Sequence, residues 1–80
     1  MIFLIEYDRR KGRIQSFKTF EDRDRHKAED ARLELELSLN RKGVDHEVVL
    51  LEALSEEAVR RTHRRYFEDI TELVRAPNEP

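Results

Sequence analysis

Two short segments of this chain are almost entirely apolar, and they constrain the fold more than any other feature. Residues 1–5 read Met-Ile-Phe-Leu-Ile, and residues 48–51 read Val-Val-Leu-Leu. Because successive side chains of a β-strand point to opposite faces, each segment is typical of a strand that is apolar on both faces. A chain of 80 residues has room for one domain, so we expect both strands in a single sheet.

The N-terminal part of the chain is predicted to form a β-hairpin. Residues 2–7 and 13–20 are extended runs rich in β-branched and aromatic side chains. Between them, Gly12 can supply the positive φ that a tight loop requires.

The rest of the chain predicts a helix, a third strand and a second helix. Residues 22–41 consist mainly of strong helix formers, with Asp22 as a candidate cap and Gly43 suited to the left-handed position after the helix. Residues 47–53 read as the third strand, and Ser55 caps the last helix. The helical stripe of that helix comprises Ala58, Val59, Thr62, His63, Tyr66, Phe67, Ile70, Leu73 and Val74.

This order of elements, ββαβα, predicts an α+β two-layer sandwich. The most apolar strand is expected in the centre, which gives the spatial order 2-1-3 with the third strand parallel to the second. Both helices are expected on one face of the sheet. Residues 1–75 would form the domain, and residues 76–80, which contain two prolines, a flexible tail.

Composition excludes several classes of function and partner. Charged residues make up 42% of the chain, but 16 basic and 18 acidic groups leave a net charge of only −2, so no global field for nucleic acid exists. No apolar run approaches the ~20 residues that cross a bilayer, so no membrane partner is expected. The chain has no cysteine, which is compatible with a reducing compartment, and a cytoplasmic location is the expectation.

The second face of the sheet is a candidate interface. If both helices cover one face, the other face leaves an open apolar patch, which is either a partner surface or is covered by a helix or by the tail. The expected patch consists of Ile2, Leu4, Phe17, Val48 and Leu50.

The first helix also carries more apolar residues than one buried stripe can use. Leu33 and Leu37 lie nearly opposite the stripe of Ala28, Ala31, Leu35 and Leu39. They are either ordinary surface leucines or a second contact surface. Two such surfaces in a chain short of core favour a non-enzymatic interaction module, either a homodimer or a binder of another protein.

Weak, non-specific nucleic-acid binding is the first alternative. Arg9, Arg10 and Arg13 lie in the hairpin, within a segment of charge +3, and could contact phosphates. The second basic run, residues 60–65, is better explained as a solvated helix face. Its expected i,i+4 ion pairs are Glu56 with Arg60, Glu57 with Arg61, Arg64 with Glu68, and Arg65 with Asp69.

A small ligand-binding or catalytic pocket is the second alternative. His63 lies in the apolar stripe of the last helix with Tyr66 beside it, so the pair could act as base and donor, or His63 could be a hydrogen-bonded core residue. His26 and His46 are distant in sequence and belong to no ligand motif. No metal-binding spacing and no glycine-rich phosphate loop is present, so we expect neither metal nor cofactor.

Overall fold

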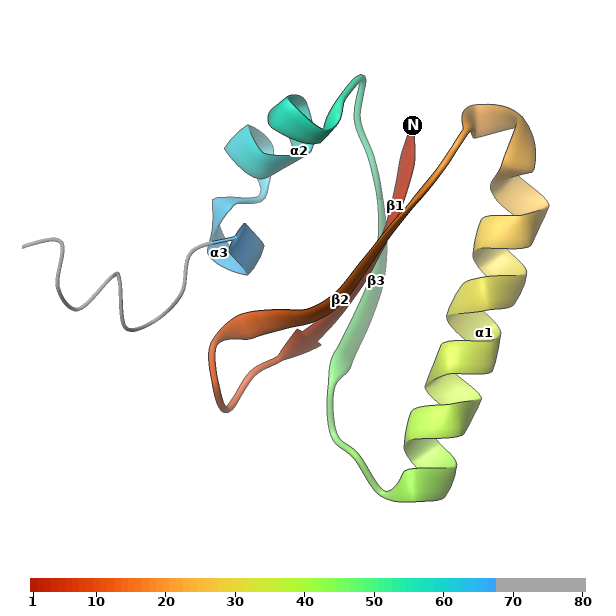
Figure 1. Cartoon of the computed structure of the whole chain (residues 1–80), viewed down its shortest axis with the longest axis vertical. Helices are drawn as coiled ribbons and strands as arrows, with labels where there is room; N and C mark the ends of the chain where they lie inside the picture. The colour runs from red at the N-terminus through yellow and green to blue at the C-terminus, as the bar shows by residue number, and fades with distance from the viewer. Residues whose placement is uncertain (68–80) are drawn as a thin grey trace, which may run out of the picture.

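The computed structural model describes residues 1–67 and contains one three-stranded sheet. The strands are β1 (Ile2–Asp8), β2 (Arg13–Phe20) and β3 (Glu47–Glu52). Their order is β2-β1-β3, with β1 antiparallel to both neighbours (Figure 1). The α+β class and the predicted strand order are therefore confirmed, and β3 runs parallel to β2 as expected.

The central strand β1 provides half of the buried apolar residues in the described part of the chain. Ile2, Phe3, Leu4 and Ile5 are each at most 5% exposed, since both faces of this strand are covered. The pairing with β2 runs from Ile2 opposite Phe20 to Asp8 opposite Arg13, with a bulge beside Glu6 and Tyr7. The core is completed by Ala28, Leu39, Val59 and Tyr66.

The first helix, α1 (Arg25–Lys42), follows a single 3-10 turn, η1 (Asp22–Asp24). Gly43 ends it with a φ of 70°, and Gly12 has a φ of 67°, so the two predicted positive-φ positions are confirmed. Asp22 is not a helix cap: its carboxylate lies 2.8 Å from the N-terminal ammonium group, which lowers the pKa of Asp22.

The second helical region is divided at His63 into α2 (Glu56–Thr62) and α3 (Arg64–Phe67). The predicted cap is confirmed, because the Ala58 amide donates to the Ser55 hydroxyl at 3.1 Å. The continuous helix expected from the sequence is interrupted because His63 leaves the helical region, with φ −124° and ψ 51°. The expected stripe residues Ile70, Leu73 and Val74, and the expected tail 76–80, lie outside the described residues.

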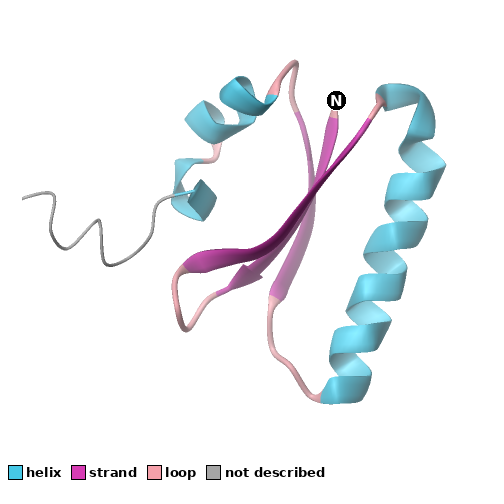
Figure 2. Ribbon diagram, in the orientation of Figure 1, coloured by secondary structure: helices cyan, strands magenta, loops and turns pink. Residues whose placement is uncertain are grey.

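The helices lie on opposite faces of the sheet, and not on one face as the sequence led us to expect (Figure 2). Leu4 points toward α1, where it lines a groove with Ala31 and Leu35. On the other face, Tyr7 packs against Tyr66 of α3 at a ring distance of 5.1 Å. The physical reason is that β1 is apolar on both faces, so each face gains from a helical cover.

No helix among residues 1–67 has the length and apolar character required to span a bilayer.

Candidate functional site

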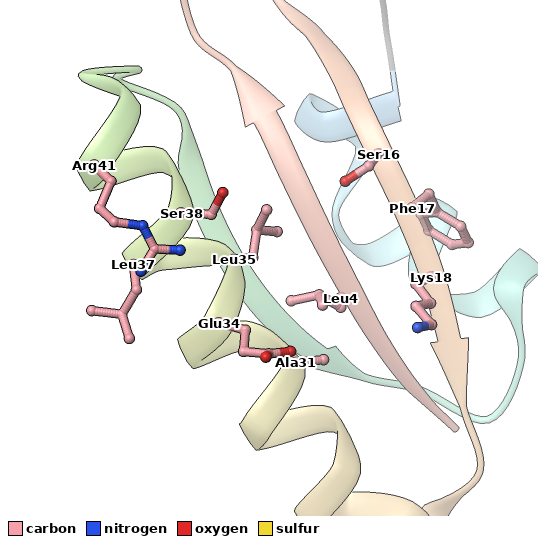
Figure 3. Close-up of a pocket in the computed structure, with 10 residues that line it drawn as sticks. All are labelled: Leu4, Ser16, Phe17, Lys18, Ala31, Glu34, Leu35, Leu37, Ser38 and Arg41. Atoms are coloured by element: carbon pink, nitrogen blue, oxygen red, sulfur yellow. The ribbon is translucent and has the colours of Figure 1, made fainter.

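An open groove lies between α1 and β2 (Figure 3). It arises because α1 packs mainly over β3 and β1, which leaves its side toward β2 uncovered. The groove has a volume of about 740 Å³. It is lined by Leu4, Ser16, Phe17, Lys18, Ala31, Glu34, Leu35, Leu37, Ser38 and Arg41.

The groove has an apolar floor and a charged outer rim. Figure 3 shows that the side chain of Leu4 points from β1 toward α1, whereas Leu37 projects from the side of α1 that is farther from the strands. The ring of Phe17 points away from α1, so this residue lines the groove without placing its ring there.

The predicted sheet-face interface is mostly covered by the chain itself. Ile2 and Leu4 are 1% and 5% exposed beneath α1, so they do not form an open patch. Val48 and Leu50 of β3 are half-buried. Phe17 lies on the opposite face, where its ring packs between Phe3 at 5.6 Å and Phe67 at 5.7 Å. α1 therefore occupies the face that was expected to be open.

The predicted second contact surface on α1, formed by Leu33 and Leu37, is in contrast exposed. Leu33 is 55% exposed and Leu37 is 48% exposed, on the side of α1 that faces away from the sheet. Val44, just after the helix, is 37% exposed. Leu37 also lines the groove, so the apolar stripe and the groove form one continuous surface.

The charges along α1 divide into paired and unpaired groups. Arg25 binds Glu52 of β3, and Arg32 binds Glu36 one turn further along the helix. Glu34 and Arg41, which both line the groove, form no ion pair with any part of residues 1–67. Within residues 1–67, these two opposite charges are therefore not engaged by another charged side chain.

A polar cluster separate from the groove is formed by Glu6, Asp8 and His46. It lies at the end of β1 near the hairpin. His46 Nδ1 lies 2.5 Å from Glu6 Oε2, and His46 Nε2 lies 3.4 Å from Asp8 Oδ2. Glu6 and Asp8 are 8% and 7% exposed. Ser16 donates to Glu6 Oε1 at 3.1 Å, so the carboxylate of Glu6 has partners on both oxygens.

The Asp8 carboxylate in this cluster also organises the hairpin loop. Its Oδ1 accepts the amide N–H groups of Arg10 and Lys11 at 3.0 and 3.1 Å. The Lys11 amide, followed by that of Arg10 and by the charge of His46, lowers the pKa of Asp8 below its ordinary value, although burial opposes this shift. Asp8 is thereby kept as a carboxylate.

The arrangement of this cluster is suited to anchoring and not to acid–base catalysis. A catalytic imidazole needs one ring nitrogen directed at a substrate, but both nitrogens of His46 face carboxylates. The cluster ties the connection between α1 and β3 to the central strand. We therefore assign it a structural role.

His63 and Tyr66, the predicted pocket pair, have separate partners. His63 Nδ1 lies 2.9 Å from the hydroxyl of its neighbour Thr62. The Tyr66 hydroxyl donates to Glu47 Oε2 at 2.5 Å, and Arg65 donates to the same hydroxyl. Burial, followed by the hydrogen bond to Glu47, raises the pKa of Tyr66. The hydroxyl of Tyr66 joins α3 to β3.

The arginines of the hairpin are exposed, but acidic groups lie close to them. Arg9 is 3.8 Å from Asp45, and the hollow beside Arg10 is also lined by Asp8 and Asp45. Arg13 is an exposed residue at the start of β2. The three arginines thus border a surface of mixed charge.

The basic run of residues 60–65 on α2 and α3 is a solvated face. This holds for those of its arginines whose ion-pair partners belong to the described residues. Arg60 binds Glu56 at 3.0 Å and Arg61 binds Glu57 at 2.8 Å, as predicted. Arg65 binds Glu47 of β3 at 3.0 Å. Glu68 and Asp69, the other expected partners, lie outside the described residues.

Residues 1–67 contain no cluster of three or more histidine, cysteine or acidic side chains able to hold a metal ion. Comparison of the chain with protein-family models, with curated proteins and with solved structures finds no match.

Proposed function

We propose that this chain is a non-enzymatic protein-interaction module that associates with a second copy of itself. The contact surface is the outer α1 surface, which we define as Leu33, Glu34, Leu37 and Arg41. Leu37 carries the proposal: it is 48% exposed on the side of α1 that faces solvent, and it also lines the groove. An apolar helix stripe that continues into a groove is typical of a protein contact surface.

The energetics of a small domain support association. Complete burial of a leucine side chain stabilises by about 1.5–3 kcal/mol relative to exposure, so two half-exposed leucines in each copy represent a substantial gain. A chain of this size supplies roughly 3 to 5 kcal/mol from its own core. Association through Leu33 and Leu37 would therefore bury apolar surface that a single chain leaves exposed.

The two alternative functions lack an observation that favours them. Nδ1 of His63 is engaged by the hydroxyl of Thr62 and the hydroxyl of Tyr66 by Glu47, so the two side chains have separate partners and do not face each other as a catalytic pair would. Arg9 faces Asp45, so the hairpin presents no uniform positive surface to phosphates. Both alternatives remain predictions from the sequence, and neither is our proposal.

Light scattering coupled to size-exclusion chromatography tests the proposed function. We expect the mass of two chains at micromolar concentration and above. The variant Leu37→Glu should shift the equilibrium to the single chain, because a buried, unpaired carboxylate opposes docking. Far-UV circular dichroism should remain unchanged, since the side chain faces away from the sheet.

Leu54→Glu is the matched control for this variant. Leu54 is 94% exposed and lies in the loop between β3 and α2, away from the outer α1 surface. The control should retain the mass of two chains. A wild-type mass of one chain at every concentration, or equal loss of association in both variants, would contradict the proposed function.

A further inference from the structure

We propose that the two copies dock through their α1 helices in antiparallel orientation, with Glu34 of each copy opposite Arg41 of the other. This inference rests on the self-association proposed above and specifies its geometry. It starts from the two groove charges of α1 that have no ion-pair partner within residues 1–67.

The spacing of these charges places them on one side of the helix. Glu34 and Arg41 are seven residues apart, which is nearly two helical turns and about 10 Å along the axis. Leu37 lies between them along the helix, and all three residues line the groove. One side of α1 therefore presents an acidic group, an apolar group and a basic group in sequence.

Two-fold symmetry turns this order into self-complementarity. In an antiparallel pair, the two-fold axis is perpendicular to the helices and passes beside Leu37. The residues of the second helix therefore run in the opposite order beside the first. If Glu34 of one copy contacts Arg41 of the other, symmetry creates the same contact a second time. The two copies of Leu37 then meet near the axis, between two oppositely charged pairs.

A parallel pair would not use these charges. An axis parallel to the helices places each residue beside its own copy, so Glu34 would face Glu34 and Arg41 would face Arg41. Like charges in contact disfavour that arrangement. The distribution of charge thus selects the antiparallel orientation.

Charge exchange tests the register directly. In E34R the introduced arginine would face Arg41 of the second copy, and in R41E the introduced glutamate would face Glu34. Each single variant loses two attractive contacts and gains two repulsive ones, so its dissociation constant should rise by about tenfold or more. The double variant E34R/R41E, which exchanges both signs, should recover the wild-type constant.

Mixing the two single variants provides the decisive measurement. In a heterodimer of E34R and R41E, every contact again joins opposite charges, so the mixture should associate more tightly than either variant alone. Size-exclusion chromatography with light scattering, with one variant carrying a small tag, identifies the mixed species. The control variants E57R and R61E change charges on α2 and should show no preference for each other.

The possible outcomes separate the two proposals. A wild-type protein that remains a single chain contradicts the proposed function. A wild-type dimer whose single variants associate normally, or whose mixture shows no preference, retains self-association but overturns the antiparallel register.

Discussion

At the scale of single residues, His46 illustrates how a polar group can hold together elements distant in sequence. Its ring lies between Glu6 and Asp8 of the central strand, and both carboxylates are almost fully buried. Two buried carboxylates without an imidazole between them would repel each other. The histidine therefore acts as the shared partner that makes their burial possible.

Replacing this imidazole should destabilise the fold strongly. His46→Leu leaves Glu6 and Asp8 buried without their common partner, and we expect the free energy of unfolding to fall by about 3 kcal/mol. Urea denaturation followed by circular dichroism measures the change. His26→Leu is the control, because the ring of His26 is fully exposed on α1. Equal stabilities of the two variants would refute the anchoring role of His46.

This cluster could have been found from the sequence only after the strand order was known. Glu6 and Asp8 share a face of β1, and the pairing of Tyr7 with Glu47 places His46 beside Asp8. The predicted order 2-1-3 contains this juxtaposition. The separation of 40 residues between Glu6 and His46 hides it, because linear spacing carries no signal of cross-strand contacts.

At the scale of elements, local signals predict strand and helix bounds well but do not predict which face a helix covers. Gly12, Gly43 and Ser55 act within a few residues of their own position, so their roles follow from local chemistry. The break at His63 depends on tertiary contacts as well. It directs Tyr66 and Phe67 onto the rings of Tyr7 and Phe17, and a helical stripe alone contains no such information.

The end of α1 provides a test of such local chemistry. Gly43 has a φ of 70°, and a Cβ added there would meet no atom within 4 Å. Gly43→Ala should therefore lower the free energy of unfolding by about 1 kcal/mol, solely from the left-handed backbone. Gly43→Asn should lower the free energy of unfolding by clearly less, because asparagine tolerates that conformation. If chemical denaturation gave Gly43→Ala the same free energy of unfolding as the wild type, this explanation would be contradicted.

At the scale of the whole molecule, the chain distributes its apolar residues over two faces of one thin sheet. The eight buried apolar residues within residues 1–67 form a small core, and four of them belong to β1. Exposed apolar side chains remain on the outer α1 surface, beside the groove that α1 leaves over β2. A core of this size and an exposed stripe on one helix together favour a folded state that gains stability from association.

Association of this kind makes thermal stability depend on protein concentration. Mass action stabilises a dimer relative to unfolded chains, and a tenfold increase in concentration adds about 1.4 kcal/mol per dimer. With about 2.1 cal/mol/K of unfolding entropy per residue, Tm should rise by about 4 °C for each tenfold increase above the dissociation constant. Differential scanning calorimetry over a hundredfold concentration range measures this slope. The slope should vanish in Leu37→Glu and persist in Leu54→Glu, whereas a wild-type Tm that is independent of concentration would show that the folded chain gains nothing from a second copy.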